Sequence, residues 1–330
     1  MSIIKYRKIY LVFSGTLTII AILLLIMWGL NVGIDFTGGS LLEVAYPNGR
    51  PAVSEINQAL SDLNLRGLKI QAIGEKGYVL RFQETGEEIH QKIMAKLNHQ
   101  DITETEPTNI KVEGESGVEI KTTGVGTDTA KENKVMENRF ESIGPAIGVE
   151  LRTKAFYAVI LVVISIIIYI AVAFRKISYP VSSWKYGVAA VIALVHDIFV
   201  TVGIFVVLGK FYGFEVNAPF VAALLTILGY SVNDTIVVFD RVRENLHKYE
   251  GDFEDIVEKS IWETMARSIN TILTVELALL ALLLFSGGVI KDFVLPLFIG
   301  IFFGAYSSIF IASQVLVTWQ KFDWARKKSE

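Results

Sequence analysis

The stretch that decides the fold lies near the start of the chain, where residues 9–30 read IYLVFSGTLTIIAILLLIMWGL and carry no charge. A helix of about 20 apolar residues is long enough to cross the hydrocarbon core of a bilayer. Further runs of this kind follow in a chain with 52% hydrophobic and only 20% charged residues. The predicted spans cover residues 9–30, 156–174, 186–208, 219–239, 269–285 and 293–319. The sequence therefore predicts an α-helical membrane protein with six transmembrane helices.

A single long polar stretch, residues 31–153, separates the first predicted span from the second. It holds 13 Lys and Arg residues against 19 Asp and Glu residues, which gives a net charge of −6. Strand patterns alternate with helical periodicity in the order β-α-β-β-α-β, at residues 40–46, 53–63, 68–73, 78–82, 87–97 and 138–143. This order is that of a ferredoxin-like split βαβ unit, so we predict one α+β domain of that type. For residues 101–134, a second hairpin and an irregular segment both remain open.

The basic residues of the short connections are distributed unevenly, and this asymmetry predicts the orientation. Lys and Arg precede the first span, follow the second and fourth, and end the chain, whereas the opposite short loops carry only Lys210 and Lys291. Because cytoplasmic loops are enriched in Lys and Arg, we expect both termini in the cytoplasm. The first span is longer than a signal-peptide core and no A-x-A site follows it, which favours an uncleaved helix. The predicted parts are a cytoplasmic start with the first span (1–30), an exterior domain (31–153), five spans with short loops (154–319) and a cytoplasmic tail (320–330).

The few charged residues within the spans are candidates for function, since an ionisable group in the bilayer is costly and is usually functional. Asp197 lies near the middle of the third span, Asp234 in the cytoplasmic third of the fourth, and Glu276 within the fifth. Arg267 begins the fifth span at a depth where an ion pair with Asp234 is geometrically feasible. A carboxylate that gains and loses an Arg partner takes up and releases a proton, so we predict that these four residues form a proton relay. A static buried pair that fixes the helix register remains the alternative for Asp234 and Arg267.

Three other patterns have structural interpretations. Gly300 and Gly304 form a small-xxx-small pair, which favours close helix packing. Residues 252–265 have one apolar side, so an amphipathic helix at the cytoplasmic membrane surface and a helix packed on the bundle are both open. For His196, which precedes Asp197, a hydrogen-bonded core position is favoured over a role in proton transfer.

Missing residues and motifs exclude several classes of function. The chain has no cysteine, which excludes disulfides, thiolate metal sites and cysteine nucleophiles. It has no P-loop, no H-E-x-x-H and no G-x-S-x-G motif, and we expect neither an enzyme nor a metal or organic cofactor. The net charge of −3 gives no basic field for a nucleic-acid partner. The transmembrane proton gradient is then the natural energy source, at roughly 2.3 kcal/mol for one charge crossing 100 mV.

Two motifs resemble the signatures of a known family. Residues 33–40 (GIDFTGGS) and 229–245 (GYSVNDTIVVFDRVREN) are similar to motifs of the bacterial SecD/SecF proteins, which are related to resistance-nodulation-division (RND) transporters. Residues 142–148 and 267–271 also fit this family. The motif positions that we single out are Gly33, Asp35, Phe36, Thr37, Gly38, Gly39, Asn233, Asp240 and Arg241.

The resemblance implies an RND-type helix bundle and an accessory subunit of the Sec preprotein translocase in the cytoplasmic (inner) membrane. It implies SecD as a separate chain, the SecYEG channel and YajC as protein partners, a preprotein as substrate, and contact with membrane lipid. It also implies that the proton-motive force completes export and that Asp234 and Arg267 take part in proton passage. Glu276 departs from the family pattern, which has an apolar or hydroxyl residue there. A proton-coupled RND-type exporter of small solutes and a passive assembly factor of the Sec channel are the alternatives.

Overall fold

The computed structural model describes residues 3–47, 49–83, 86–98, 135–174, 181–286 and 288–329. The chain divides into two compact units. The first, here called the helical unit, comprises Met1–Phe36 and Val149–Glu330, and the second, the sheet unit, comprises Thr37–Gly148. Each unit has its own hydrophobic core.

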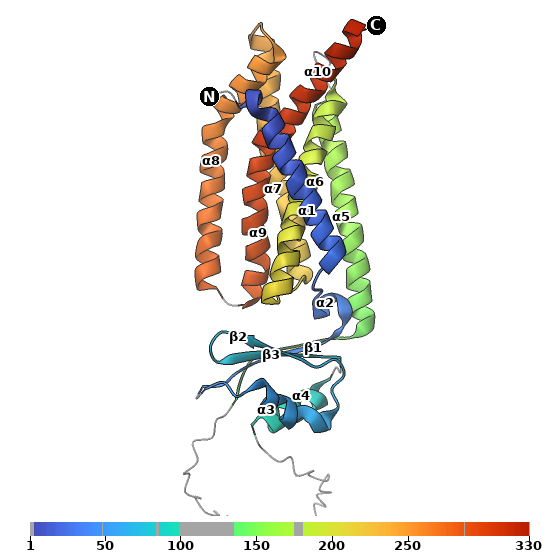
Figure 1. The fold of residues 1–330 in the computed structure, drawn as a ribbon, viewed down its shortest axis with the longest axis vertical. Helices are drawn as coiled ribbons and strands as arrows, with labels where there is room; N and C mark the ends of the chain where they lie inside the picture. The colour runs from blue at the N-terminus through green and yellow to red at the C-terminus, as the bar shows by residue number, and fades with distance from the viewer. Residues whose placement is uncertain are drawn as a thin grey trace, which may run out of the picture. The chain divides into compact units, whose positions relative to one another are not determined.

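The helical unit consists of long apolar helices joined by short connections (Figure 1). Six stretches within the described ranges are long and apolar enough to cross a membrane, which confirms the predicted number. The helices are α1 (Arg7–Trp28), α5 (Pro145–Ala173), α6 (Ser183–Tyr212), α7 (Ala218–Lys248), α8 (Phe253–Phe285), α9 (Gly288–Ser307) and α10 (Ser313–Ser329). A π-helical segment, Ser308–Ala312, joins α9 to α10, so that the helical backbone continues from one to the other. A 3-10 turn, Ile4–Tyr6, precedes α1, and a short helix, α2 (Ile34–Thr37), follows it.

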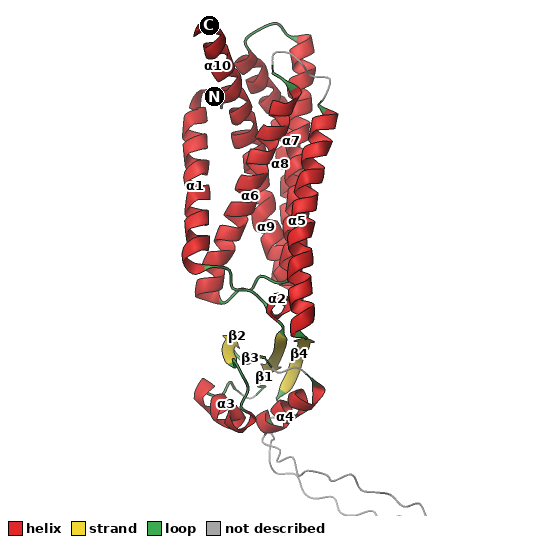
Figure 2. Cartoon of the chain, turned by 90° about the vertical axis from the view of Figure 1, so that its right-hand side faces the viewer, coloured by secondary structure: helices red, strands yellow, loops and turns green. Residues whose placement is uncertain are grey.

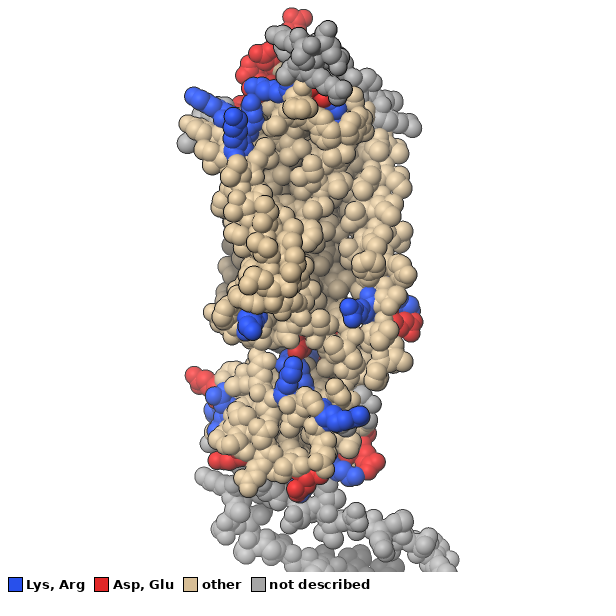
Figure 3. Space-filling view, turned by 45° about the vertical axis from the view of Figure 1, so that its right-hand side comes forward, with Lys and Arg blue, Asp and Glu red and all other residues tan. Residues whose placement is uncertain are grey.

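The distribution of polar side chains explains why these helices form a bundle suited to a bilayer. Figure 3 shows the charged side chains of the helical unit gathered at its two ends, with an uncharged belt between them on this face. The spans in α6, in α7 and in α9 with α10 are buried along much of their length, whereas those in α1, α5 and α8 are mostly exposed. The chain termini lie at the same end of the bundle (Figure 1). A belt of exposed apolar side chains is what lipid contact requires.

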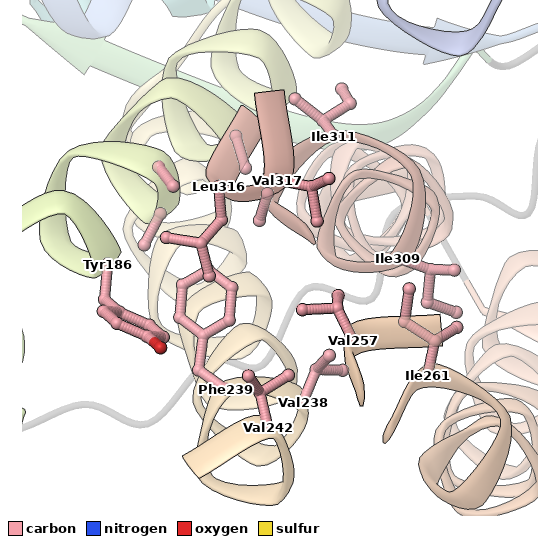
Figure 4. Close-up of a cluster of buried hydrophobic side chains, with 14 of the residues drawn as sticks. Tyr186, Val238, Phe239, Val242, Val257, Ile261, Ile309, Ile311, Leu316 and Val317 are labelled. Carbon is pink, nitrogen blue, oxygen red and sulfur yellow. The ribbon is translucent and has the colours of Figure 1, made fainter. Parts of the chain in front are cut away.

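Two clusters of buried side chains hold the bundle together. One, drawn in Figure 4, includes Tyr186 of α6, Phe239 of α7 and Ile261 of α8. The other includes Phe205 of α6 and Phe220 of α7. Since the first cluster also contains Phe253 and Val257, the apolar side of residues 252–265 packs against the bundle. This stretch is the first part of the continuous helix α8, so of the two interpretations left open above the structure favours packing on the bundle.

The sheet unit has the predicted β-α-β-β-α-β order, and the ferredoxin-like prediction is confirmed. Its elements are β1 (Gly39–Ala45), α3 (Val53–Leu60) with a 3-10 turn (Ser61–Leu63), β2 (Lys69–Ile73), β3 (Gly77–Phe82), α4 (Glu87–Leu97) and β4 (Met136–Ile143). The strands pair antiparallel in the order β2-β3-β1-β4. Helices α3 and α4 cover one face of the sheet, where their apolar residues meet those of β1 and β3 (Figure 2). The hairpin considered for residues 101–134 lies outside the described residues.

Candidate functional site

Asp197 lies at the centre of a buried polar cluster between three helices. Its side chain on α6 is fully buried, and its Oδ2 accepts hydrogen bonds from Ser231 of α7 (2.6 Å) and Ser307 of α9 (2.7 Å). Its Oδ1 lies 3.0 Å from Nδ1 of His196. A buried carboxylate is tolerated when donors surround it, and here those donors come from α6, α7 and α9. The cluster therefore fixes α6, α7 and α9 against one another.

The close approach of α9 to α7 places the serines of this cluster. A Cβ atom added at Gly300 would lie 2.2 Å from Cδ1 of Ile227, and one added at Gly304 would lie 3.0 Å from Cβ of Ser231. The predicted close packing at these two glycines is thus confirmed. Immediately beyond them, Ser308 opens the π-helical segment and bonds to Thr235 of α7 through its hydroxyl (2.8 Å). Single π-helical turns occur frequently at functional sites, because they re-aim side chains within a helix.

Asp234 occupies a different environment at the interface of α7 and α8. Its Oδ1 accepts a hydrogen bond from Ser268 of α8 (2.6 Å), whereas its buried Oδ2 has no hydrogen-bond partner in the described part of the chain. Arg267 is exposed, and among the described residues no ion pair joins it to Asp234. Its charge nevertheless acts favourably on the carboxylate of Asp234. The feasible ion pair between these residues is thus not formed in this conformation, in which Ser268 is the partner.

Glu276 lies further along α8, and both of its carboxylate oxygens are buried without a hydrogen-bond partner among the residues that the structure describes. The same holds for the phenol oxygen of Tyr230 on α7. The charges of Asp234 and Glu276 both act on the Tyr230 phenol, which places it within electrostatic range of the two carboxylates. Asp234 therefore lies at the interface of α7 and α8, Glu276 lies further along α8, and Asp197 lies between α6, α7 and α9.

The first motif holds the beginning of α7. Oδ2 of Asp35 accepts a hydrogen bond from the backbone N–H of Ala218 (2.6 Å), the first residue of α7. The N–H of Gly33 donates to the carbonyl oxygen of Val216 (2.8 Å), and Phe36 is buried in a core cluster of the bundle. A carboxylate at a helix N-terminus satisfies a free N–H group and interacts favourably with the helix dipole. This motif thus positions the helix that carries Asp234.

The paired glycines of the same motif serve the sheet unit. Gly38 has φ +72°, and an added Cβ atom would lie 2.7 Å from Cα of Pro145. Gly39 has φ +118°, and its Cβ atom would lie 2.7 Å from the carbonyl oxygen of Phe82. Only glycine combines these backbone angles with so close an approach of another backbone. Thr37, which precedes them, is exposed and donates through Oγ1 to the carbonyl oxygen of Gly38 (3.1 Å).

The remaining motif residues lie at the interface of α7 and α8 or on the surface. Arg241 of α7 pairs with Glu263 of α8 (2.6 Å), which also accepts a hydrogen bond from Asn245 (2.8 Å). This network holds α8 in register with α7, which in turn sets Ser268 opposite Asp234. Asp240 and Asn233 are both exposed, and Oδ1 of Asp240 lies 3.9 Å from Nη1 of Arg243.

Sequence reasoning did not single out four residues that surround these carboxylates. They are Ser231 and Ser307 at Asp197, Ser268 at Asp234, and Tyr230, four residues before Asp234 on α7. One signal was present, since Tyr230 and Ser231 lie within the second family motif and Ser268 lies beside Arg267. For Ser307 the only signal was its place after Gly304 on a helix predicted to pack closely.

Comparison with known proteins identifies the family. The family described as "Protein export membrane protein SecD/SecF, C-terminal" matches residues 124–322, and the "SecD/SecF GG Motif" matches residues 25–46. The chain is 39% identical to the protein translocase subunit SecF of Thermobaculum terrenum, over 99% of this chain and 96% of that one. It is 32% identical to the protein translocase subunit SecDF of Bacillus subtilis, over 95% of this chain and 37% of that one.

Solved structures show the same fold. The crystal structure of SecDF from Thermus thermophilus, a translocon-associated membrane protein, superposes with a TM-score of 0.76 at 30% identity. The match covers 97% of this chain and 39% of that one, so the chain spans about two fifths of that SecDF protein. A SecDF structure in the super-membrane-facing form matches with a TM-score of 0.64. The chain is a membrane protein that belongs to the SecD/SecF family.

Proposed function

We propose that this chain is the SecF subunit of the Sec translocase, which works with a separate SecD chain and uses the proton-motive force to complete protein export. The SecF and SecDF names of its relatives support the assignment to the translocase. The single observation that supports proton coupling is the state of Asp234. One oxygen of this carboxylate within a span accepts a hydrogen bond from Ser268, and the other oxygen has no partner among the described residues. The charge of Arg267 acts on the same carboxylate.

The chemistry of this arrangement suits a reversible proton acceptor. In its ionised form Asp234 is stabilised by Ser268 and by the charge of Arg267, which remains protonated throughout. A shift of α8 along α7 that moves Arg267 changes the balance between the charged and the neutral carboxyl group. Proton binding and helix movement are then coupled, and roughly 2.3 kcal/mol is released for each proton that crosses 100 mV.

We assign different roles to the two buried aspartates of the proposed relay. Asp197 has its donors in place from three helices and is the fixed inner member, which holds the bundle around the pathway. Asp234 has spare acceptor capacity and is the member that exchanges protons. This division explains why both aspartates occur in a region where an ionised group is costly.

The proposed setting is the cytoplasmic membrane, with both termini in the cytoplasm and residues 31–153 outside. The basic residues of the loops and the position of the termini at one end of the bundle support this orientation. The proposed partners are SecD, the SecYEG channel, YajC and the exported preprotein. The SecDF relatives, in which both subunits are named for one chain, support the pairing with SecD.

Export in cells that lack their own SecF tests this function. The chain is expressed with its matching SecD, and export of a preprotein is followed by pulse-chase labelling. Asp234→Asn keeps the shape of the side chain and removes the charge, so we expect accumulation of unprocessed preprotein. Asp255→Asn, which neutralises an exposed carboxylate on the same α7–α8 pair, serves as the control and should export normally. Full export by a normally assembled Asp234→Asn variant would show that Asp234 has no role in proton coupling, and full export after neutralisation of Asp197 and Glu276 as well would identify a passive assembly factor.

A further inference from the structure

Four buried oxygen atoms on the neighbouring helices α7 and α8 are left without a partner among the described residues. They are Oδ2 of Asp234, the phenol oxygen of Tyr230 and both carboxylate oxygens of Glu276, and none has a hydrogen-bond partner in the described ranges. Buried polar atoms in proteins are almost always paired with protein groups or with ordered water. Since an unpaired buried polar group is destabilising, a cluster of such atoms points to a hydrated polar path rather than to ordinary packing.

The register of the two helices places these groups in a row. The hydrogen bond between Ser268 and Asp234 sets the two residues at one level. Glu276 lies eight residues after Ser268 on α8, which is a rise of about 12 Å along the helix axis. Tyr230 lies four residues before Asp234 on α7, and because α7 runs antiparallel to α8, this is a rise of about 6 Å in the same direction. Tyr230 and Asp234 are four residues apart and share one face of α7. Along the helix axes, Tyr230 therefore lies at a level midway between the carboxylates, in agreement with the action of both charges on its phenol.

We infer that Glu276 and Tyr230 extend the proposed proton pathway beyond Asp234, with the Tyr230 hydroxyl and water as the link between the two carboxylates. This inference rests on the proposed function of Asp234. The carboxyl group of Glu276 gives its proton to a bridging water, which gives a proton to the Tyr230 oxygen. Tyr230 in turn gives its own hydroxyl proton to a second water, which gives a proton to the carboxylate of Asp234. The net result is an ionised Glu276, a neutral Asp234 and an unchanged tyrosine.

The side chains present fit this task better than a packing role. A phenol both donates and accepts a hydrogen bond, which a relay between two carboxyl groups requires. Tyr230 differs from the packing residue Tyr186, whose hydroxyl group is also unpartnered among the described residues, in that the charges of two carboxylates act on its phenol. Glu276 is likewise buried at its oxygens, whereas the neighbouring Thr274 satisfies its hydroxyl group on the backbone of Asn270 (2.7 Å).

Proton flux through the assembled complex tests the inference. Proteoliposomes containing this chain and its SecD partner are given an imposed pH gradient, and a trapped pH-sensitive dye reports flux. Tyr230→Phe removes one oxygen atom and Glu276→Gln removes the exchangeable proton. We expect each to lower flux by about tenfold to a hundredfold, the range for a lost hydrogen bond to a charged group. Because the two residues act in series, the double variant should be no slower than the slower single variant.

Tyr186→Phe is the matched control, since Tyr186 is also a buried span tyrosine whose hydroxyl has no partner among the described residues, but it packs among Phe174 and Phe239. It should leave flux unchanged. Unchanged flux in Tyr230→Phe and Glu276→Gln, together with lost flux in Asp234→Asn, would overturn this inference and leave the proposed function intact. Unchanged flux in Asp234→Asn, or no flux in the unmodified complex, would overturn both.

Discussion

The carboxylates within the spans differ in the number of donors that the described residues provide. Asp197 contacts two serine hydroxyls and one imidazole nitrogen, Asp234 one serine hydroxyl, and Glu276 has no such contact. A carboxylate that is fully hydrogen-bonded is held in one geometry, whereas one with free lone pairs can accept a proton or a new partner. The number of donors thus falls in the order Asp197, Asp234, Glu276.

The serines at Asp197 offer a first prediction. Ser231→Ala and Ser307→Ala each remove a donor to the buried carboxylate, and each should lower the free energy of unfolding by about 1.5–3 kcal/mol. Thermal unfolding of the purified chain in detergent measures this effect. Thr226→Ala, whose hydroxyl bonds only to the backbone of Ala222 on the exposed side of α7, is the control and should have little effect. Equal stability of all three variants would contradict the anchoring role of Asp197.

The cap at the start of α7 offers a second prediction. Asp35→Ala leaves the N–H of Ala218 without its carboxylate acceptor and should destabilise the chain by about 1 kcal/mol, as for a lost helix cap. Asp35→Asn retains an oxygen acceptor and loses only the charge, so its effect should be smaller. The midpoint temperatures of thermal unfolding of the Asp35→Ala and Asp35→Asn variants are compared with that of the unmodified chain. A larger loss in Asp35→Asn than in Asp35→Ala would show that the cap is not the function of this motif residue.

At the scale of elements, the close contact of α7 with α9 is what brings the polar groups together. Gly300 and Gly304 let the backbones approach, and Ser231 and Ser307 then reach the same carboxylate. The π-helical segment follows at once and turns Ser308 towards Thr235. Helix association in membranes depends on such close packing, because lipid removes the hydrophobic driving force between helices.

Two alanine substitutions, one at a closely packed glycine and one at a glycine in open space, test this packing. Gly300→Ala places a Cβ atom 2.2 Å from Ile227, so α7 and α9 must separate, at an expected loss of about 1–3 kcal/mol in unfolding free energy. Gly229→Ala adds the same atom on α7, where nothing lies within 4 Å, and should be neutral or stabilising by up to about 1 kcal/mol. A second substitution, Ile227→Ala, should partly restore the Gly300→Ala variant. Equal stability of the two glycine variants would contradict the close approach.

Sequence alone predicted the elements well, because each is encoded locally. Apolar runs of span length predicted six spans, and alternating patterns predicted the strands and helices of the sheet unit. The pairings around the carboxylates were not predictable in this way. Each residue turns a helix by about 100°, so an error of one residue in rotation or depth would replace Ser268 by another partner of Asp234. The continuous helix α8 and the π-helical segment likewise depend on packing rather than on local pattern.

At the scale of the whole molecule, the chain combines a helical unit with the apolar surface of a membrane protein and a sheet unit with its own core. The chain spans about two fifths of the SecDF relative whose structure is known. The proposed pathway in this chain is consequently expected to operate together with a SecD chain, and its activity should be measured on the pair.

The proposed orientation can be read directly, because the chain lacks cysteine. Single variants Glu55→Cys, in the sheet unit, and Lys248→Cys, at the end of α7, introduce exposed unique thiols. In intact spheroplasts, a membrane-impermeant maleimide should label Glu55→Cys and should label Lys248→Cys only after lysis. The reverse pattern would mean that the loop basic residues do not set the orientation.

The central claim, that Asp234 couples the proton-motive force to export, is tested most directly by preprotein export into inverted membrane vesicles with and without an imposed proton gradient. Vesicles that contain SecD and the unmodified chain should export faster when the gradient is present. Vesicles with Asp234→Asn should export at the same lower rate under both conditions. An equal acceleration by the gradient in both kinds of vesicle would contradict the account.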